Sequence, residues 1–129
     1  MNAFARALKR PLARMLLALF FSVAGLLHFI FPAAYIGVMP PWLPAHAELV
    51  FISGVCELAG GIGLLIASTR VAAGWGLLLL CIAVLPANVQ MWLAAIASHK
   101  AFWLQALLFL RLPLQVPLMI WIWVVMRQR

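Results

Sequence analysis

The chain has 129 residues, of which 68% are hydrophobic and only 9% are charged. This balance leaves too little polar surface for a soluble domain and indicates an integral membrane protein with one domain, residues 1–129. The net charge of +7 does not indicate nucleic-acid binding, because most basic residues lie at the ends of apolar runs, where they set topology and contact anionic lipid headgroups.

Four apolar runs are long enough to span a bilayer, which takes about 20 residues of helix. We predict spans at about residues 14–31, 47–67, 71–96 and 102–126. No run alternates with the period of two that a membrane barrel requires, so the predicted fold class is an all-α membrane protein, a bundle of four transmembrane helices. The first run has the basic flank of a signal peptide, but it is long and contains His28, so we expect it to remain as a span.

A proline-rich segment, residues 32–44, separates the first two spans and excludes a continuous helix there. Its Tyr35 and Trp42 suit the headgroup region, where amphipathic rings anchor, so we expect this segment at the outer surface of the membrane. The glycines of the second span permit close approach of a neighbouring helix. The third and fourth spans are expected to kink at their internal prolines, which are Pro86, Pro113 and Pro117.

The distribution of basic residues predicts that both termini are cytoplasmic. In this topology Lys100 is the basic residue on the outer side, and Arg111 lies within the fourth span. All the others fall on the cytoplasmic side, namely Arg6, Lys9, Arg10, Arg14, Arg70, Arg127 and Arg129.

Glu57 is the strongest functional signal, because it is one of the two acidic residues and lies within a predicted span. A carboxylate at that depth costs several kcal/mol unless it is paired, solvated or protonated. Helical rise places Glu57 roughly 15 Å and Arg111 roughly 13 Å below the outer edge of the bundle, so we predict an ion pair between them. By the same measure Asn88 lies at roughly 12 Å and His28 at roughly 5 Å.

We therefore predict a polar cluster in the outer half of the bundle, with Glu57, Arg111, Asn88 and Gln115 together and His28 above them near the mouth. Two interpretations stay open. The cluster either binds a ligand or serves only to fix the register between helices. His28 has the same two alternatives, since a lone histidine is often a satisfied core residue.

The remaining polar residues form no catalytic or metal-binding motif. Cys56 and Cys81 are expected to be buried structural thiols, and His46 and His99 to be solvated residues of different loops. Two carboxylates cannot build a multi-carboxylate metal site, and no nucleophile–base pair or phosphate loop is visible. We expect no metal and no catalytic activity of the protein on its own.

Several motifs resemble those of DoxX-like membrane proteins. The first is G-L-L-H-F-I-F-P-A-A-Y at 25–35, followed by M-P-P-W-L-P at 39–44. The later spans carry I-S-G-V-C-E-L-A-G-G-I-G-L-L at 52–65, P-A-N-V-Q-M at 86–91 and R-L-P-L-Q at 111–115. The resemblance covers almost the whole chain, and the motifs contain all five residues of the predicted polar cluster.

The resemblance implies a multi-pass protein of the bacterial inner membrane that is an accessory to redox or quinone-linked processes. A small amphipathic molecule such as a quinone would bind in the polar cavity, with Arg111 and Asn88 as donors, Glu57 holding Arg111, and His28 exchanging protons with the outer side. The alternative is a non-catalytic scaffold or assembly factor, whose glycine-rich face docks another membrane protein; a homo-oligomer is also open. A small-solute transporter is disfavoured by four spans without an inverted repeat.

Overall fold

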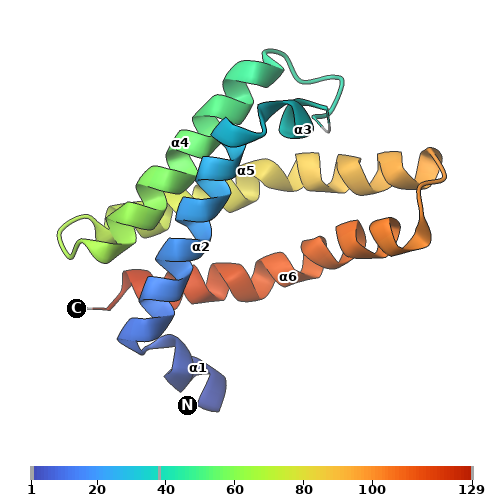
Figure 1. The fold of residues 1–129 in the computed structure, drawn as a ribbon. Helices are drawn as coiled ribbons and strands as arrows, with labels where there is room; N and C mark the ends of the chain where they lie inside the picture. Colours follow the sequence, from blue (N-terminus) through green and yellow to red (C-terminus); the bar gives the residue numbers. More distant parts are fainter. Residues whose placement is uncertain (1, 38, 129) are drawn as a thin grey trace.

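The structure, a computed structural model, describes residues 2–37 and 39–128, and within them it is helical with connecting turns (Figure 1). The elements are α1 (Ala3–Leu8), α2 (Pro11–Ile30), α3 (Pro32–Ile36), α4 (His46–Leu65), α5 (Arg70–Ala97) and α6 (Phe102–Met126). Four of them, α2, α4, α5 and α6, are long and apolar enough to cross a membrane, which is compatible with a multi-pass membrane protein. The predicted fold class is therefore confirmed. Arg129, predicted to be cytoplasmic, lies outside the described residues.

The predicted spans agree closely with the helices, and the largest difference is at the start of α2, which begins at Pro11 rather than at 14. Prolines set two of the helix starts. Pro11 and Pro32 occupy the beginning of α2 and α3, where the missing N–H removes no helical hydrogen bond. The predicted break in residues 32–44 is confirmed, because α3 is short and ends at Ile36.

The four long helices pack in chain order: α2 lies along α4, α4 along α5, and α5 along α6. Contact between α2 and α6 is slight. Figure 1 shows the reason, since the α2/α4 pair and the α5/α6 pair meet near the two termini and diverge away from them. We call the end with α1, the α4–α5 turn and the C-terminus the terminal end, and the end with α3 and the α5–α6 turn the loop end.

The buried core lies toward the terminal end. All four long helices contribute to it, with Leu17 of α2, Leu64 of α4, Leu77 of α5 and Ile122 of α6 each at most 1% exposed. Near the loop end the ribbons of the two helix pairs lie apart (Figure 1). The polar residues expected in the outer half of the bundle therefore belong to its less tightly packed half.

Glycines bring α2 and α4 into backbone contact. A Cβ atom on Gly25 would lie 2.7 Å from the backbone oxygen of Gly54 and 2.7 Å from the backbone nitrogen of Leu58. A Cβ atom on Gly61 would lie 2.8 Å from the backbone oxygen of Ala18. The close approach predicted from the glycines of the second span is confirmed, and the helix that approaches this face is α2.

Arg70 ties the terminal end together. Its guanidinium is 4% exposed and donates to the carbonyl oxygens of Leu64 at 2.7 Å, Leu65 at 3.3 Å and Gln128 at 3.0 Å. Helices leave their last carbonyls without an internal partner, so Arg70 satisfies the end of α4 and also binds the carbonyl of Gln128, two residues past the end of α6. Sequence analysis had assigned Arg70 to membrane topology alone.

Candidate functional site

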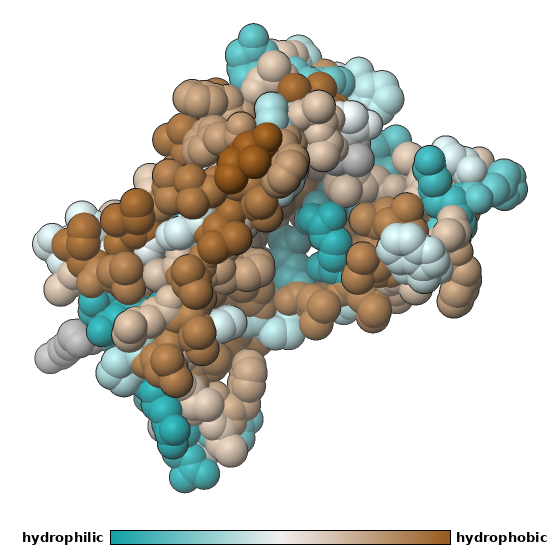
Figure 2. Space-filling view, viewed as in Figure 1, coloured by the Kyte–Doolittle hydropathy of each residue, from teal (hydrophilic) through white to brown (hydrophobic). Residues whose placement is uncertain are grey.

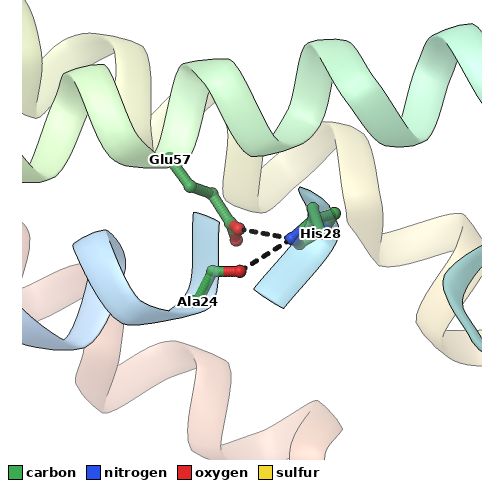
Figure 3. Close-up of polar contacts among 3 residues, drawn as sticks. All are labelled: Ala24, His28 and Glu57. Atoms are coloured by element: carbon green, nitrogen blue, oxygen red, sulfur yellow. Dashed lines mark hydrogen bonds and ion pairs between the residues drawn. The ribbon is translucent and has the colours of Figure 1, made fainter. Parts of the chain in front are cut away.

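The partner of Glu57 is His28, and the predicted ion pair with Arg111 is wrong. In the described part of the chain, the Glu57 carboxylate lies 3.1 Å from Nδ1 of His28, which projects from α2 (Figure 3). The side chains are 18% and 12% exposed, respectively. The physical reason is the glycine contact, which brings α2 against the Glu57 face of α4, whereas α6 packs on α5 instead.

The hydrogen bonding of His28 fixes the place of one proton. Nδ1 also lies 2.8 Å from the carbonyl oxygen of Ala24, one turn earlier in α2 (Figure 3). A carbonyl oxygen can only accept, so Nδ1 carries a hydrogen in this contact. The contact with Glu57 is thus an ion pair when Nε2 is protonated as well.

Glu57 retains an unused acceptor. Although Oε2 lies 3.1 Å from Nδ1, it has no hydrogen-bond partner among the described residues and is buried. The 3.1 Å contact is therefore electrostatic, because the Nδ1 hydrogen is directed at Ala24 rather than at Glu57. A buried acceptor without a donor is rare in proteins, and a proton or the donor group of a ligand would satisfy this one.

Tyr35, which the sequence predicts at the membrane interface, completes the site from α3. Its ring stacks on the imidazole of His28 with centroids 4.0 Å apart and an interplanar angle of 19°. Burial raises the pKa of the Tyr35 hydroxyl above its ordinary value of 10.0, the charge of Glu57 raises it further, and the charge of Arg111 opposes this. The two charges therefore both act on Tyr35, although they do not contact each other.

Arg111 and Asn88 form a second pair on the α5/α6 arm. Nη2 of Arg111 donates to Oδ1 of Asn88 at 3.3 Å, and this hydrogen bond is exposed. Figure 2 shows a hollow between the α2/α4 arm and the loop-end part of α6, and the surface deep inside it is hydrophilic. Arginine has five N–H donors, so one bond to Asn88 leaves most of the guanidinium available.

Gln115 makes its hydrogen bond outside the His28–Glu57 and Arg111–Asn88 pairs. Its side chain is buried, and its amide nitrogen donates to the carbonyl oxygen of Cys81 on α5. Gln115 therefore joins α6 to α5, and the predicted single network of five residues is three separate interactions.

Two smaller predictions are corrected. Cys56 is exposed on α4, whereas Cys81 is buried as expected. His46 is half-buried at the start of α4, with Nε2 3.0 Å from the carbonyl oxygen of Pro40, so it is not a solvated loop residue. His99 does lie in an exposed turn, between α5 and α6.

Comparison with known proteins gives one match. No curated protein and no solved structure matches the chain. Nothing in these comparisons connects the chain with DoxX-like proteins, so that resemblance stays a prediction. A family model described as a domain of unknown function, DUF8561, matches residues 17–126, from within α2 to the last residue of α6. Since this is most of the chain, the protein belongs to the DUF8561 family.

Proposed function

We propose that this protein binds a small amphipathic molecule of the quinone class in the hollow between its two helix pairs, as an accessory to a redox or quinone-linked process. The supporting observation is that the two arms carry complementary groups. Oε2 of Glu57 is a buried acceptor without a donor, and Arg111 on the opposite arm is a charged donor. In this proposal the membrane is the bacterial inner membrane, the loop end faces outward, and both termini are cytoplasmic.

The two arms offer complementary hydrogen bonding. Arg111 presents fixed N–H donors to a ligand carbonyl, and Asn88 holds the guanidinium in place. Glu57 presents an acceptor to a ligand hydroxyl. A quinone carries carbonyl oxygens and a quinol carries hydroxyl groups at the same positions, so either redox form finds a partner.

The surroundings of Arg111 suit an apolar molecule. Leu107 and Leu114 lie one turn before and one turn after Arg111 on α6, on neighbouring positions of the helix surface, and both are exposed, by 53% and 61%. On the other arm the Tyr35 ring covers His28. Ligand sites are generally apolar with a few well-placed polar groups, and this combination has that character.

The scaffold alternative loses one of its supports. It required a glycine face free to dock another membrane protein, but Gly54 and Gly61 face α2. Gly60 and Gly63 face α5, where added Cβ atoms would lie 2.5 Å from the side chain of Leu77 and 2.8 Å from that of Ala73. These glycines serve the internal packing of the chain, so the ligand-binding proposal is the better supported one.

The test is a titration of detergent-purified protein with the short-chain quinone ubiquinone-1 and with its quinol, followed by calorimetry. Arg111→Gln is expected to weaken quinone binding by roughly 10- to 100-fold, the effect of losing a charged hydrogen bond. Glu57→Gln is expected to weaken the binding of the quinol more than the binding of the quinone. Arg6→Gln, an exposed charge on α1 at the other end, is the matched control and should bind like the wild type. Binding that is absent, or equal in the wild type and Arg111→Gln, would reject the proposal.

A further inference from the structure

A second cavity, at the terminal end, lies far from the proposed quinone site. It has a volume of about 570 Å³ and lies between the start of α2 and the end of α6. Its lining residues are Lys9, Pro11, Arg14, Trp123, Val124, Arg127 and Gln128. Because these positions are at the ends of two spanning helices, the cavity is at the level where lipid headgroups meet the hydrocarbon.

The lining is strongly cationic, and no acidic side chain balances it. Lys9, Arg14 and Arg127 contribute three positive charges. The two acidic residues of the chain are both elsewhere, since Glu48 is in the first turn of α4 at the loop end and Glu57 is paired with His28. Like charges held together at a membrane surface attract anionic groups from outside the protein.

Arg14 is held in a defined orientation. Its Nη1 donates to Oε1 of Gln128 at 3.2 Å, and the Gln128 amide nitrogen in turn donates to the Leu8 carbonyl oxygen at 3.0 Å. Nε of Arg14 is buried and has no hydrogen-bond partner among the described residues. Such a fixed guanidinium with an unused N–H suits an anion that accepts two parallel hydrogen bonds, as a phosphate does.

The other parts of the lining favour the same class of ligand. Arg127 lies over the Trp123 ring, 5.2 Å from its centroid, and Trp123 packs edge-on against Trp75. This contact orients the Arg127 side chain before any ligand arrives. In addition, α2 begins beside the cavity with no acidic residue in its first turn and no side-chain cap, so the positive end of its dipole is not neutralised.

We propose that this cavity is a binding site for a phosphate group, carried either by an acidic phospholipid or by a free phosphate anion. Arg14 and Arg127 bind the phosphate oxygens, Lys9 adds a third positive charge, and Trp123 lies beside the group at headgroup depth. The site is independent of the quinone site, so each proposal can fail without the other.

The experiment uses delipidated protein in neutral detergent, titrated with dihexanoyl phosphatidylglycerol in one arm and with inorganic phosphate in the other, and followed by native mass spectrometry and calorimetry. The test variant is Lys9→Gln with Arg127→Gln, because these side chains make no hydrogen bond to another helix in the described structure. The control is Arg6→Gln with Lys100→Gln, which removes the same charge but lies outside the lining. If the double test variant has a lower melting midpoint than the wild type, the single variant Lys9→Gln is used in its place.

One phosphatidylglycerol per wild-type chain, bound about 30-fold more weakly by the test variant and normally by the control, is the expected result and identifies a lipid headgroup site. In a second outcome, inorganic phosphate saturates the site as phosphatidylglycerol does, and the same variant weakens its binding. That result supports the site and makes a free anion its ligand. The proposal is overturned if neither probe saturates, or if both double variants weaken binding equally, since that would reflect diffuse surface charge.

Discussion

Tyr35 is the single tyrosine of the chain, and its hydroxyl lies within the influence of both Glu57 and Arg111. It is therefore a built-in reporter of the polar site. We predict that phenolate absorbance of the protein titrates with a midpoint above 10, because burial and Glu57 raise the pKa of Tyr35. Glu57→Gln should lower this midpoint, whereas Arg111→Gln should raise it. The measurement is a spectrophotometric titration from about pH 9 to 13 in detergent, a range that brackets the usual pKa of tyrosine.

The same shift has a consequence for stability. A pKa raised in the folded state means that the unfolded chain loses its tyrosine proton first, so the contribution of Tyr35 to stability is complete below about pH 10 and is lost as the pH rises through the folded pKa. Tyr35→Phe should remove this part of the pH dependence. Glu48→Gln, a charge at the start of α4 on an exposed position, is the control for the titration. Midpoints that move in the same direction in the Glu57 and Arg111 variants would show that the two charges do not share the site.

The partners of the polar side chains could not be predicted from the sequence. Helical rise predicts similar depths for Glu57 and Arg111, but it carries no information on which helices are neighbours. The neighbour of Glu57 is decided by Gly25 and Gly54, whose lack of side chains brings α2 against α4. A signal for Tyr35 was also present, since Pro32 restarts the helix and allows α3 to turn back over His28.

The elements themselves depend on the backbone contact between α2 and α4. We predict that Gly25→Ala destabilises the bundle by roughly 1–3 kcal/mol, because its Cβ would meet two backbone atoms of α4 at 2.7 Å and the helices must separate. Gly76→Ala on α5 is the matched control, since a Cβ there meets nothing within 4 Å and alanine favours a helix. Thermal unfolding in detergent should show a lowered midpoint for the first variant and an unchanged or higher one for the second. Equal midpoints would mean that the contact is looser than described.

The helices were well predicted from sequence because span length and hydropathy are fixed by the bilayer rather than by tertiary contacts. The largest boundary error is at the start of α2, where the helix begins at Pro11 rather than at residue 14. The helix ends were harder. Arg70 looked like a topology signal, and only its position against the carbonyls of Leu64, Leu65 and Gln128 shows that it stabilises two helix ends.

For the whole molecule, Arg70 joins α4, α5 and Gln128, which lies two residues past the end of α6. We predict that Arg70→Leu lowers the free energy of unfolding by about 3 kcal/mol, because three carbonyl groups lose a charged donor in a site where Arg70 is 4% exposed. Arg70→Lys should have a free energy of unfolding between those of the wild type and Arg70→Leu, since one ammonium cannot reach all three oxygens. Arg6→Leu, an exposed arginine of α1, is the control. Circular dichroism during heating in detergent measures the effect, and an Arg70→Leu protein that melts with the wild type would exclude this function of the side chain.

The two helix pairs pack together at the terminal end and diverge toward the loop end, so a small change in the angle between them is amplified at the loop end. They are joined firmly near Leu17 and its core neighbours, while His28 lies eleven residues further along α2, roughly 16 Å away. If the two helix pairs tilt by about 10° relative to each other at this core, α2 moves by roughly 3 Å relative to the α5/α6 pair at the level of His28. The distance between the acceptor of Glu57 and the donor of Arg111 therefore depends on the packing around Leu64 and Ile122. We expect conservative substitutions in that core to change which ligands the proposed site accepts.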